Sequence, residues 1–168
     1  MKWMIIILVM MSLIGSMMWV MPTKRQKYQA GLRLKAKQLG LQVQLEKVTP
    51  PRAKGELEPE VRDRTAYRLM RQGLSREQKN RFKSWHIFRV ESLADTGLPP
   101  GWSWQQGERD LSDDQLAQVA DLVAQLPDGV FSIESTPVYL GVHWDEEGGD
   151  STLQALHAEL NRFSEKGF

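Results

Sequence analysis

Hydrophobic and polar residues are distributed unevenly along this chain. From Trp3 to Met21 there are nineteen consecutive residues without a charge, and all of them except two serines and one glycine are apolar. As a helix this run would be about 28 Å long, close to the hydrocarbon thickness of a bilayer. Trp3 and Trp19 stand near its two ends, where indole rings favour the membrane interface. The run predicts a transmembrane anchor over residues 1–22.

A cleaved signal peptide is the alternative to a permanent anchor. Cleaved signals have an apolar core of about 7–15 residues, followed by a cleavage site made of small residues. Here the run is longer, and it ends in "WVMPTKR", which has no pair of small residues. Pro22 followed closely by Lys24 and Arg25 makes a poor processing site. We therefore expect the anchor to be retained, with a periplasmic binding or assembly factor as the alternative.

Residues 23–40 form a basic segment directly after the anchor, and we expect a helix that ends at Gly40. On the other side of the apolar run only Lys2 and the amino terminus carry charge. Because cations flank the cytoplasmic end of a membrane helix, we expect the N-terminus outside and the C-terminal domain in the bacterial cytoplasm, at the inner membrane. The cations expected to set this topology and to contact anionic lipid headgroups are Lys24, Arg25, Lys27, Arg33, Lys35 and Lys37.

The anchor and the basic segment "PTKRQKYQAGLRLKAK" together resemble a known family. Over residues 3–37 the chain is similar to the YajC family, the small single-pass accessory subunits of the bacterial Sec translocase. The resemblance implies an anchor with its N-terminus outside and its C-terminus inside. It also implies a place beside the translocase.

After residue 40 the apolar positions change to period two, which is typical of strands. "LQVQLEKV" (41–48) and "VRDRTAYRLMR" (61–71) each alternate apolar and polar residues, and the loop between them carries three prolines and a glycine. Ser75 and Gln78 have the spacing of a capping box, which predicts a short polar helix. "SWHIFRVES" (84–92) predicts a third strand, with His86 on the face opposite Trp85 and Ile87.

The C-terminal third predicts two helices and two more strands. Ser112 is expected to cap a helix over "DDQLAQVADLVAQL", whose apolar residues form one stripe. "VFSIES" and "VYLGVHW" read as strands joined at Thr136 and Pro137, and Ser151 is expected to open a final helix. The order is βββαββα with one extra short helix. It predicts an α+β domain over residues 41–168, a small, mainly antiparallel sheet with helices packed on one side.

Residues 93–111 predict a long loop that contains two tryptophans, Trp102 and Trp104. Indole rings in a loop either pack over a sheet edge, which is the commoner outcome, or contact a partner or a lipid surface. The pair is therefore a candidate partner surface.

Charge separates along the chain, although the net charge is only +1. Residues 23–92 carry eighteen Lys and Arg against seven Asp and Glu, whereas residues 107–168 carry three against thirteen. The two halves are expected either to neutralise each other within one fold or to form a basic face and an acidic face. Residues 62–89 also mix cations with aromatic residues, as single-stranded nucleic-acid binders do, yet no recognised motif accompanies them.

The residues offer little for catalysis. The chain has no Cys, which excludes a disulfide framework, thiol catalysis and Cys-ligated metal sites. No nucleophile elbow or phosphate-binding glycine loop is present. "HWDEEGGD" is the most suggestive oxygen-rich cluster, and it reads either as a weak metal site or as a solvated turn before a helix. Its members are His143, Asp145, Glu146, Glu147 and Asp150.

These patterns together predict a non-enzymatic, membrane-tethered adaptor or accessory subunit of an inner-membrane complex. We expect no cofactor and no metal. The expected partners are the anionic bilayer surface and a protein of the complex. A tethered nucleic-acid-binding or metal-binding domain is the remaining alternative.

Overall fold

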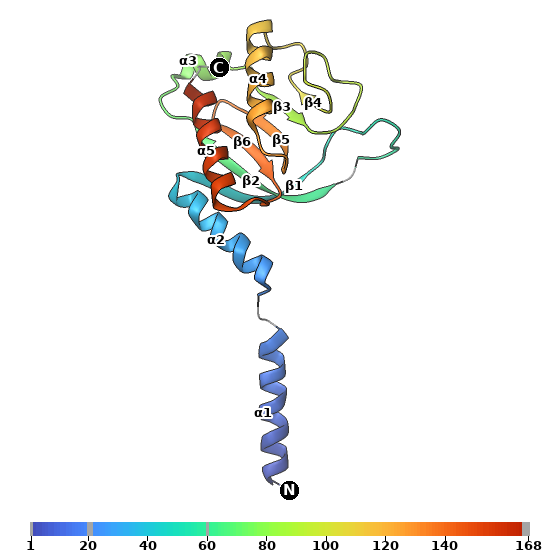
Figure 1. Cartoon of the computed structure of the whole chain (residues 1–168), viewed down its shortest axis with the longest axis vertical. Coiled ribbons are helices and arrows are strands. Elements are labelled where there is room, and N and C mark those ends of the chain that lie inside the picture. Colours follow the sequence, from blue (N-terminus) through green and yellow to red (C-terminus); the bar gives the residue numbers. More distant parts are fainter. Residues whose placement is uncertain (1, 20–21, 60, 166–168) are drawn as a thin grey trace. The chain divides into compact units, whose positions relative to one another are not determined.

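The computed structural model describes residues 2–19, 22–59 and 61–165, without the side chains of residues 17–19 (Figure 1). The chain divides into two compact units, residues 1–31 and residues 32–168. The second unit is an α+β domain built on one six-stranded antiparallel sheet. The predicted fold class is confirmed at this level.

Helix α1, Lys2–Trp19, belongs to the first unit. Its large apolar side chains are exposed from Trp3, at 78%, to Ile14, at 57%. Within the described residues, no helix combines the length and the apolar character that crossing a membrane requires.

Helix α2, Lys24–Gln38, is the predicted basic helix. Thr23 caps it, because its hydroxyl accepts from the backbone of Gln26 while the Gln26 side chain accepts from the backbone of Thr23. Gly40 ends it with a φ of +85°, a conformation that glycine adopts without a steric penalty. The predicted end of the helix is confirmed.

The sheet has the strand order β1-β2-β6-β5-β3-β4, and every neighbouring pair is antiparallel. The N-terminal strands β1 and β2 pair with the C-terminal strand β6, so both ends of the domain are needed to build it. The strands are β1 Leu41–Val48, β2 Arg62–Met70, β3 Trp85–Phe88, β4 Ser103–Gln106, β5 Val130–Ser135 and β6 Tyr139–Trp144.

Three further helices are α3, Arg76–Arg81, α4, Asp113–Gln125, and α5, Gly149–Glu165. Ser75 forms the capping box that the sequence predicts, and Ser112 caps α4 as predicted, with Gln115 completing a capping box there too. The last helix begins two residues before the predicted Ser151, because Gly149 and Asp150 already take part in its first turn.

One face of the sheet, here called the helix face, packs against α2, α4 and α5. Directly opposed residues form a continuous apolar row across all six strands: Val43, Tyr67, Val142, Ile133, Ile87 and Trp104. Leu32 and Ala36 of α2, Leu122 of α4 and Leu156 of α5 belong to the same core. In Figure 1 helices α4 and α5 lie side by side over the sheet. Burial of this row removes much apolar surface from water and dominates the stability of the domain.

Residues 93–111 were predicted to be a loop, but they contain strand β4. The prediction is wrong for these strand residues. "SWQQ" is too short to show an alternating pattern, and it is specified by pairing with β3. The structure places Trp102 and Trp104 in the core at 4% and 3% exposure, so neither indole ring is presented at the surface. The indole nitrogen of Trp104 donates to the carbonyl oxygen of Thr96 at 2.9 Å.

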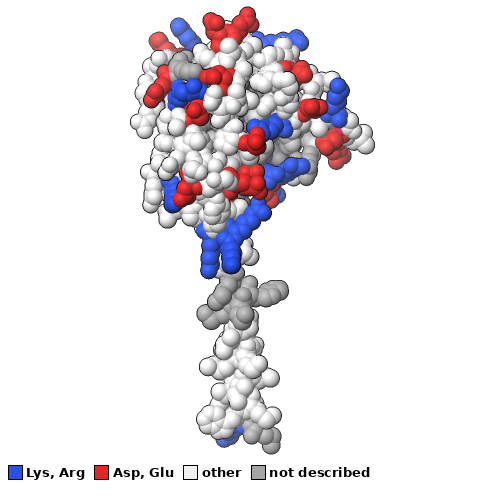
Figure 2. Space-filling model, viewed as in Figure 1, with Lys and Arg blue, Asp and Glu red and all other residues white. Residues whose placement is uncertain are grey.

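The opposite charges of the two halves of the chain meet within the domain. Arg33 pairs with Glu146, Lys35 with Asp150 and Arg68 with Glu46. The first two of these pairs join the basic N-terminal part to the acidic C-terminal part. Figure 2 accordingly shows both signs of charge mixed over the visible face of the domain and almost none along α1.

Candidate functional site

The second face of the sheet, here called the polar face, carries the side chains that point away from the helices. It holds a chain of hydrogen-bonded polar groups across four strands and, beside it, a cavity lined by arginines. These features are here called the histidine network (Glu46, His143, Ser132 and His86) and the arginine pocket (Arg62, Arg64, Arg89, Phe88 and Phe131). Val48 and Phe88 line both the arginine pocket and the neighbouring hollow over the histidine network.

The histidine network runs from β1 to β3, and its bond between Glu46 and His143 passes over β2 to join β1 to β6. Nε2 of His143 lies 2.5 Å from a carboxylate oxygen of Glu46, and its Nδ1 lies 3.2 Å from Oγ of Ser132. Nε2 of His86 approaches the same Oγ at 2.6 Å. One arrangement of protons satisfies every bond: His143 donates to Glu46, Ser132 donates to His143, and His86 donates to Ser132. The chain of bonds is therefore complete with both imidazoles neutral.

Burial keeps these imidazoles neutral. The pKa of His86 falls to about 3, because burial disfavours the imidazolium and His143 lies nearby. Burial also lowers the pKa of His143, although Glu46 opposes this shift. The arrangement resembles the parts of a serine hydrolase, but Ser132 has no exposed surface and both of its neighbours hold it. The network therefore offers no accessible nucleophile, and it fixes the register of four strands.

Arg68 extends the network towards the surface. Its guanidinium donates to Glu46 at 2.6 Å and to Gln44 at 2.9 Å, and it lies 4.4 Å from the centre of the Tyr139 ring. Tyr139 in turn donates to Glu134 at 2.8 Å. Burial and this carboxylate raise the pKa of Tyr139 to about 12, so its hydroxyl remains a donor at neutral pH. These partners hold Glu46 in place for His143.

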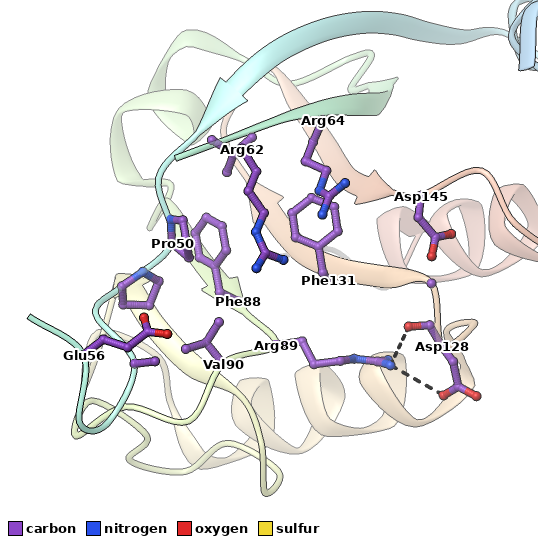
Figure 3. Close-up of a pocket in the computed structure, with 14 residues that line it drawn as sticks. Pro50, Glu56, Arg62, Arg64, Phe88, Arg89, Val90, Asp128, Phe131 and Asp145 are labelled. Carbon is purple, nitrogen blue, oxygen red and sulfur yellow. Dashed lines mark hydrogen bonds and ion pairs between the residues drawn. The ribbon is translucent and has the colours of Figure 1, made fainter. Parts of the chain in front are cut away.

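The arginine pocket lies at the end of the polar face where the loop between β1 and β2 crosses it (Figure 3). It has a volume of about 250 Å³. The loop reaches the segment after β3, since Lys54 donates its backbone N–H to the carbonyl oxygen of Glu91 at 2.9 Å. Pro50 and Pro51 of this loop form one wall. Proline fixes φ and so stiffens this wall against collapse into the cavity.

A bulge in strand β5 supplies the floor of the pocket. The register between β5 and β6 shifts between Val130 and Ser132, so that Phe131 has no direct partner in β6. The extra residue allows Val130 and Ile133 to reach the core while Phe131 and Ser132 both lie on the polar face. Phe131 lies beside Phe88 in the pocket, and its ring centre is 5.6 Å from that of His143. The bulge thus joins the pocket to the histidine network.

Three arginines enter the arginine pocket from two strands. Arg62 and Arg64 come from β2, and Arg89 follows β3 directly. Arg64 stacks on Phe131 with its guanidinium carbon 5.1 Å from the ring centre, and Arg89 lies 5.2 Å from the ring of Trp102. Figure 3 shows Arg62 reaching between the two phenylalanine rings into the cavity. Cations held on aromatic faces keep their N–H groups available in the plane of the guanidinium.

Three carboxylates stand around these cations. Arg89 donates to the backbone oxygen of Asp128 at 2.7 Å and approaches its carboxylate at 3.5 Å. The carboxylate of Asp145 packs on Gly129, where a Cβ atom would lie only 2.2 Å from Oδ1. Glycine at position 129 therefore makes room for Asp145 at the wall of the cavity. The third carboxylate, Glu56, comes from the loop between β1 and β2.

The acidic cluster that the sequence analysis singled out is divided among three places. His143 belongs to the histidine network, Asp145 lines the arginine pocket, and Asp150 pairs with Lys35 of α2. Glu146, only 3% exposed, accepts two hydrogen bonds from Arg33 at 2.6 and 2.9 Å and one from Tyr67 at 2.8 Å. In the part of the chain that the structure describes, no three His, Asp or Glu side chains lie close enough together to hold a metal ion.

The residues predicted to set the membrane topology divide between two environments. The side chains of Lys24, Arg25, Lys27 and Lys37 are exposed on α2. Arg33 is instead part of the domain, where its hydrogen bonds to Glu146 raise its pKa. Trp3 is exposed on α1, and the side chain of Trp19 lies outside the described residues.

Sequence reasoning did not find the arginine pocket or the histidine network. The arginines of β2 were visible as a polar face opposite the apolar one, but nothing in the pattern joined them to Arg89 or Asp145. The strand order brings β2, β6, β5 and β3 together, and no local signal reports that order. The adjacent apolar residues Val130 and Phe131, which break the alternation of "VFSIES", were the nearest available sign of a bulge.

Comparisons with known proteins add no further identification. No family model matches this sequence, and no curated protein or solved structure matches it.

Proposed function

We propose that this protein is a membrane-tethered, non-enzymatic binding module, an adaptor or accessory subunit of a bacterial inner-membrane complex. The apolar segment 3–21 serves as the anchor, the basic helix α2 follows it, and the domain binds a partner. The N-terminus lies outside and the domain lies in the cytoplasm. The resemblance of residues 3–37 to the YajC family makes the Sec translocase the first complex to test.

The observation that carries the proposal is the exposure of the apolar side chains of α1. From Trp3 to Ile14 each large apolar residue of this helix is at least half exposed. An exposed apolar surface of this extent is costly in water and marks an interaction with lipid or with another protein. The uncharged run of the sequence continues through residues 20 and 21, which lie outside the described residues, and its full length suits a bilayer.

Two features of the domain favour binding over catalysis. Ser132, whose hydroxyl is paired with two histidines, has no exposed surface. The arginine pocket, in contrast, offers cations, aromatic faces and a preformed cavity, which are the ordinary features of a binding site.

Membrane attachment is tested by extracting bacterial membranes with alkaline carbonate after expression of the full chain. We expect the wild-type chain to stay in the membrane fraction. The double variant Ile7→Arg, Met10→Arg should move to the soluble fraction, because each buried cation costs roughly 3 kcal/mol at the centre of a membrane helix. The matched control Ile7→Leu, Met10→Leu should stay with the membrane. A wild-type chain that carbonate releases would contradict the anchor.

Orientation is tested with reporters fused after Phe168. A reporter that is active only in the cytoplasm should be active, and one that is active only in the periplasm should not. The reverse result would overturn the cytoplasmic assignment. N-terminal sequencing of the mature chain separates the remaining alternative, since a start after residue 20 would show a cleaved signal peptide. Crosslinking in solubilised membranes should then capture the translocase if the resemblance reflects a shared partner.

A further inference from the structure

We propose that the arginine pocket binds a monocarboxylate that carries an apolar group. The proposal rests on the proposed function only in treating the domain as a binding module, and membrane attachment is tested separately. The polar face, the bulge at Phe131 and the loop between β1 and β2 together build a cavity in which cations and apolar surface lie side by side (Figure 3).

Unused hydrogen-bond donors point to an anion. Nε of Arg64 and Nε of Arg89 are both buried, and within the described residues neither has a hydrogen-bond partner. A buried donor without a partner costs free energy, which an incoming acceptor recovers. A guanidinium presents N–H groups in a planar fork that matches the two oxygens of a carboxylate. The stacking of Arg64 on Phe131 holds such a fork in one plane.

The charge of the lining favours a single negative charge on the ligand. Three arginines are balanced by the carboxylates of Glu56, Asp128 and Asp145, so the formal charge of the pocket is close to zero. The cost of removing an ion from water grows with the square of its charge, whereas its attraction to a fixed set of arginines grows only linearly, so a lining without surplus cations disfavours a dianion such as a phosphate ester. A monocarboxylate pays a much smaller desolvation cost and can still contact Arg62 and Arg64.

The apolar lining of the arginine pocket determines which group the ligand carries beside its carboxylate. Phe88, Phe131, Val48 and Val90 line the cavity together with Pro50 and Pro51. The volume of about 250 Å³ corresponds to roughly eight water molecules at about 30 Å³ each. A ring or branched chain of about seven carbon atoms beside a carboxylate fits this space. The two sources of such a group are a free small acid and the C-terminus of a protein chain that ends in an apolar residue.

Calorimetric titration of the full chain in a non-ionic detergent tests the proposal. The probes are phenylacetate, its neutral amide phenylacetamide, acetate and inorganic phosphate, each also titrated into detergent alone. We expect phenylacetate to bind and to bind at least about tenfold more tightly than the other three, since only it supplies both the charge and the ring. Absence of phenylacetate binding up to about 10 mM, or equal binding of the amide or of phosphate, would overturn the proposal.

Two pocket variants and one control locate the binding. Arg64→Gln and Arg62→Gln should each raise the dissociation constant of phenylacetate at least about tenfold, because each removes a charge-assisted contact. Arg76→Gln removes an exposed arginine of α3 outside the pocket and should leave the constant unchanged. Unchanged binding in both pocket variants would overturn the assignment. If one of them does not fold, the other decides the result.

A pair of peptides separates the two sources of the carboxylate. The first is an acetylated tetrapeptide ending in phenylalanine with a free C-terminus, and the second is the same peptide as its amide. Tighter binding of the free acid than of phenylacetate identifies a protein C-terminus, whereas exclusion of both peptides identifies a free small acid. Both results uphold the carboxylate site. Equal binding of the two peptides would contradict it.

Discussion

The buried carboxylate of Glu146 joins α2 to the sheet. It lies at a φ of +65°, a conformation that few non-glycine residues adopt, and it is held there by Arg33 and Tyr67. Burial and the hydrogen bond to Glu146 raise the pKa of Tyr67, so this hydroxyl donates at any physiological pH. The carboxylate thus fastens α2 to the sheet through three hydrogen bonds from two residues, Arg33 of α2 and Tyr67 of β2.

Replacing Glu146 with Gln should lower the free energy of unfolding by about 3 kcal/mol. The change removes the charge that balances Arg33, and a buried pair that loses one partner is strongly destabilised. Urea unfolding of the full chain in detergent, followed by tryptophan fluorescence, measures the loss. Glu147→Gln is the matched control, because Glu147 is exposed and should cost less than about 1 kcal/mol. Equal effects of the two changes would show that Glu146 does not hold α2.

The histidine network predicts a dependence of stability on pH. His86 has a pKa of about 3 in the folded chain and about 6.5 when unfolded, so the unfolded state binds more protons between these values. The stabilising contribution of its neutral form is therefore complete above about pH 6.5 and is lost as the pH falls towards 3. The loss amounts to about 1.4 kcal/mol per pH unit.

Unfolding free energies of the wild-type chain and of His86→Gln, measured at pH 7.5 and pH 5.0, test this dependence. The wild-type chain should lose about 2 kcal/mol more than the variant over this range. Glu46, Glu134 and Arg68 face the network in both chains, so their contributions cancel in the difference. Parallel losses in the two chains would contradict a neutral, buried His86.

Elements with the same cap can differ in importance. Ser75 and Ser112 form identical capping boxes, yet α3 buries no residue while α4 buries Val119, Leu122 and Val123. Local capping signals therefore identify where a helix begins, and tertiary packing decides how much the helix contributes to the stability of the fold.

Ser112→Ala should lower the global free energy of unfolding by about 1 kcal/mol, whereas Ser75→Ala should leave it nearly unchanged and only loosen α3. Denaturant unfolding reports the first effect, and amide hydrogen exchange of residues 76–81 reports the second. A global loss of the same size in both variants would show that α3 belongs to the cooperative unit of the fold.

At the scale of the whole molecule the chain divides into two compact units. The core begins at Leu32, since the buried residues of α2 are Leu32 and Ala36. The domain therefore needs the second half of α2 for its core.

A chain that starts at residue 22 should unfold cooperatively with a free energy within about 1 kcal/mol of the full chain, and it should stay in solution without detergent. A chain that starts at residue 41 should be several kcal/mol less stable, because it loses two buried side chains and leaves Glu146 without Arg33. Thermal unfolding of the two chains, followed by circular dichroism, measures the difference. Equal stability would contradict the role of α2.

The sequence by itself determined the elements whose cause is local. The caps at Ser75 and Ser112, the end of α2 at Gly40 and the alternation in β1, β2 and β3 all follow from interactions between residues a few positions apart. The α+β class followed from the same patterns, because period two and period 3.6 segments have apolar faces that must be buried together.

Only the tertiary structure decided the strand order, the place of β4 and the assembly of the polar face. Tertiary contacts join residues that are far apart in the chain, such as Glu46 with His143 and Arg33 with Glu146, and no local pattern specifies which strands become neighbours. The bulge at Phe131 depends on that pairing too, since an extra residue exists only relative to a partner strand. The arginine pocket is therefore a product of topology, although every residue in it was visible in the sequence.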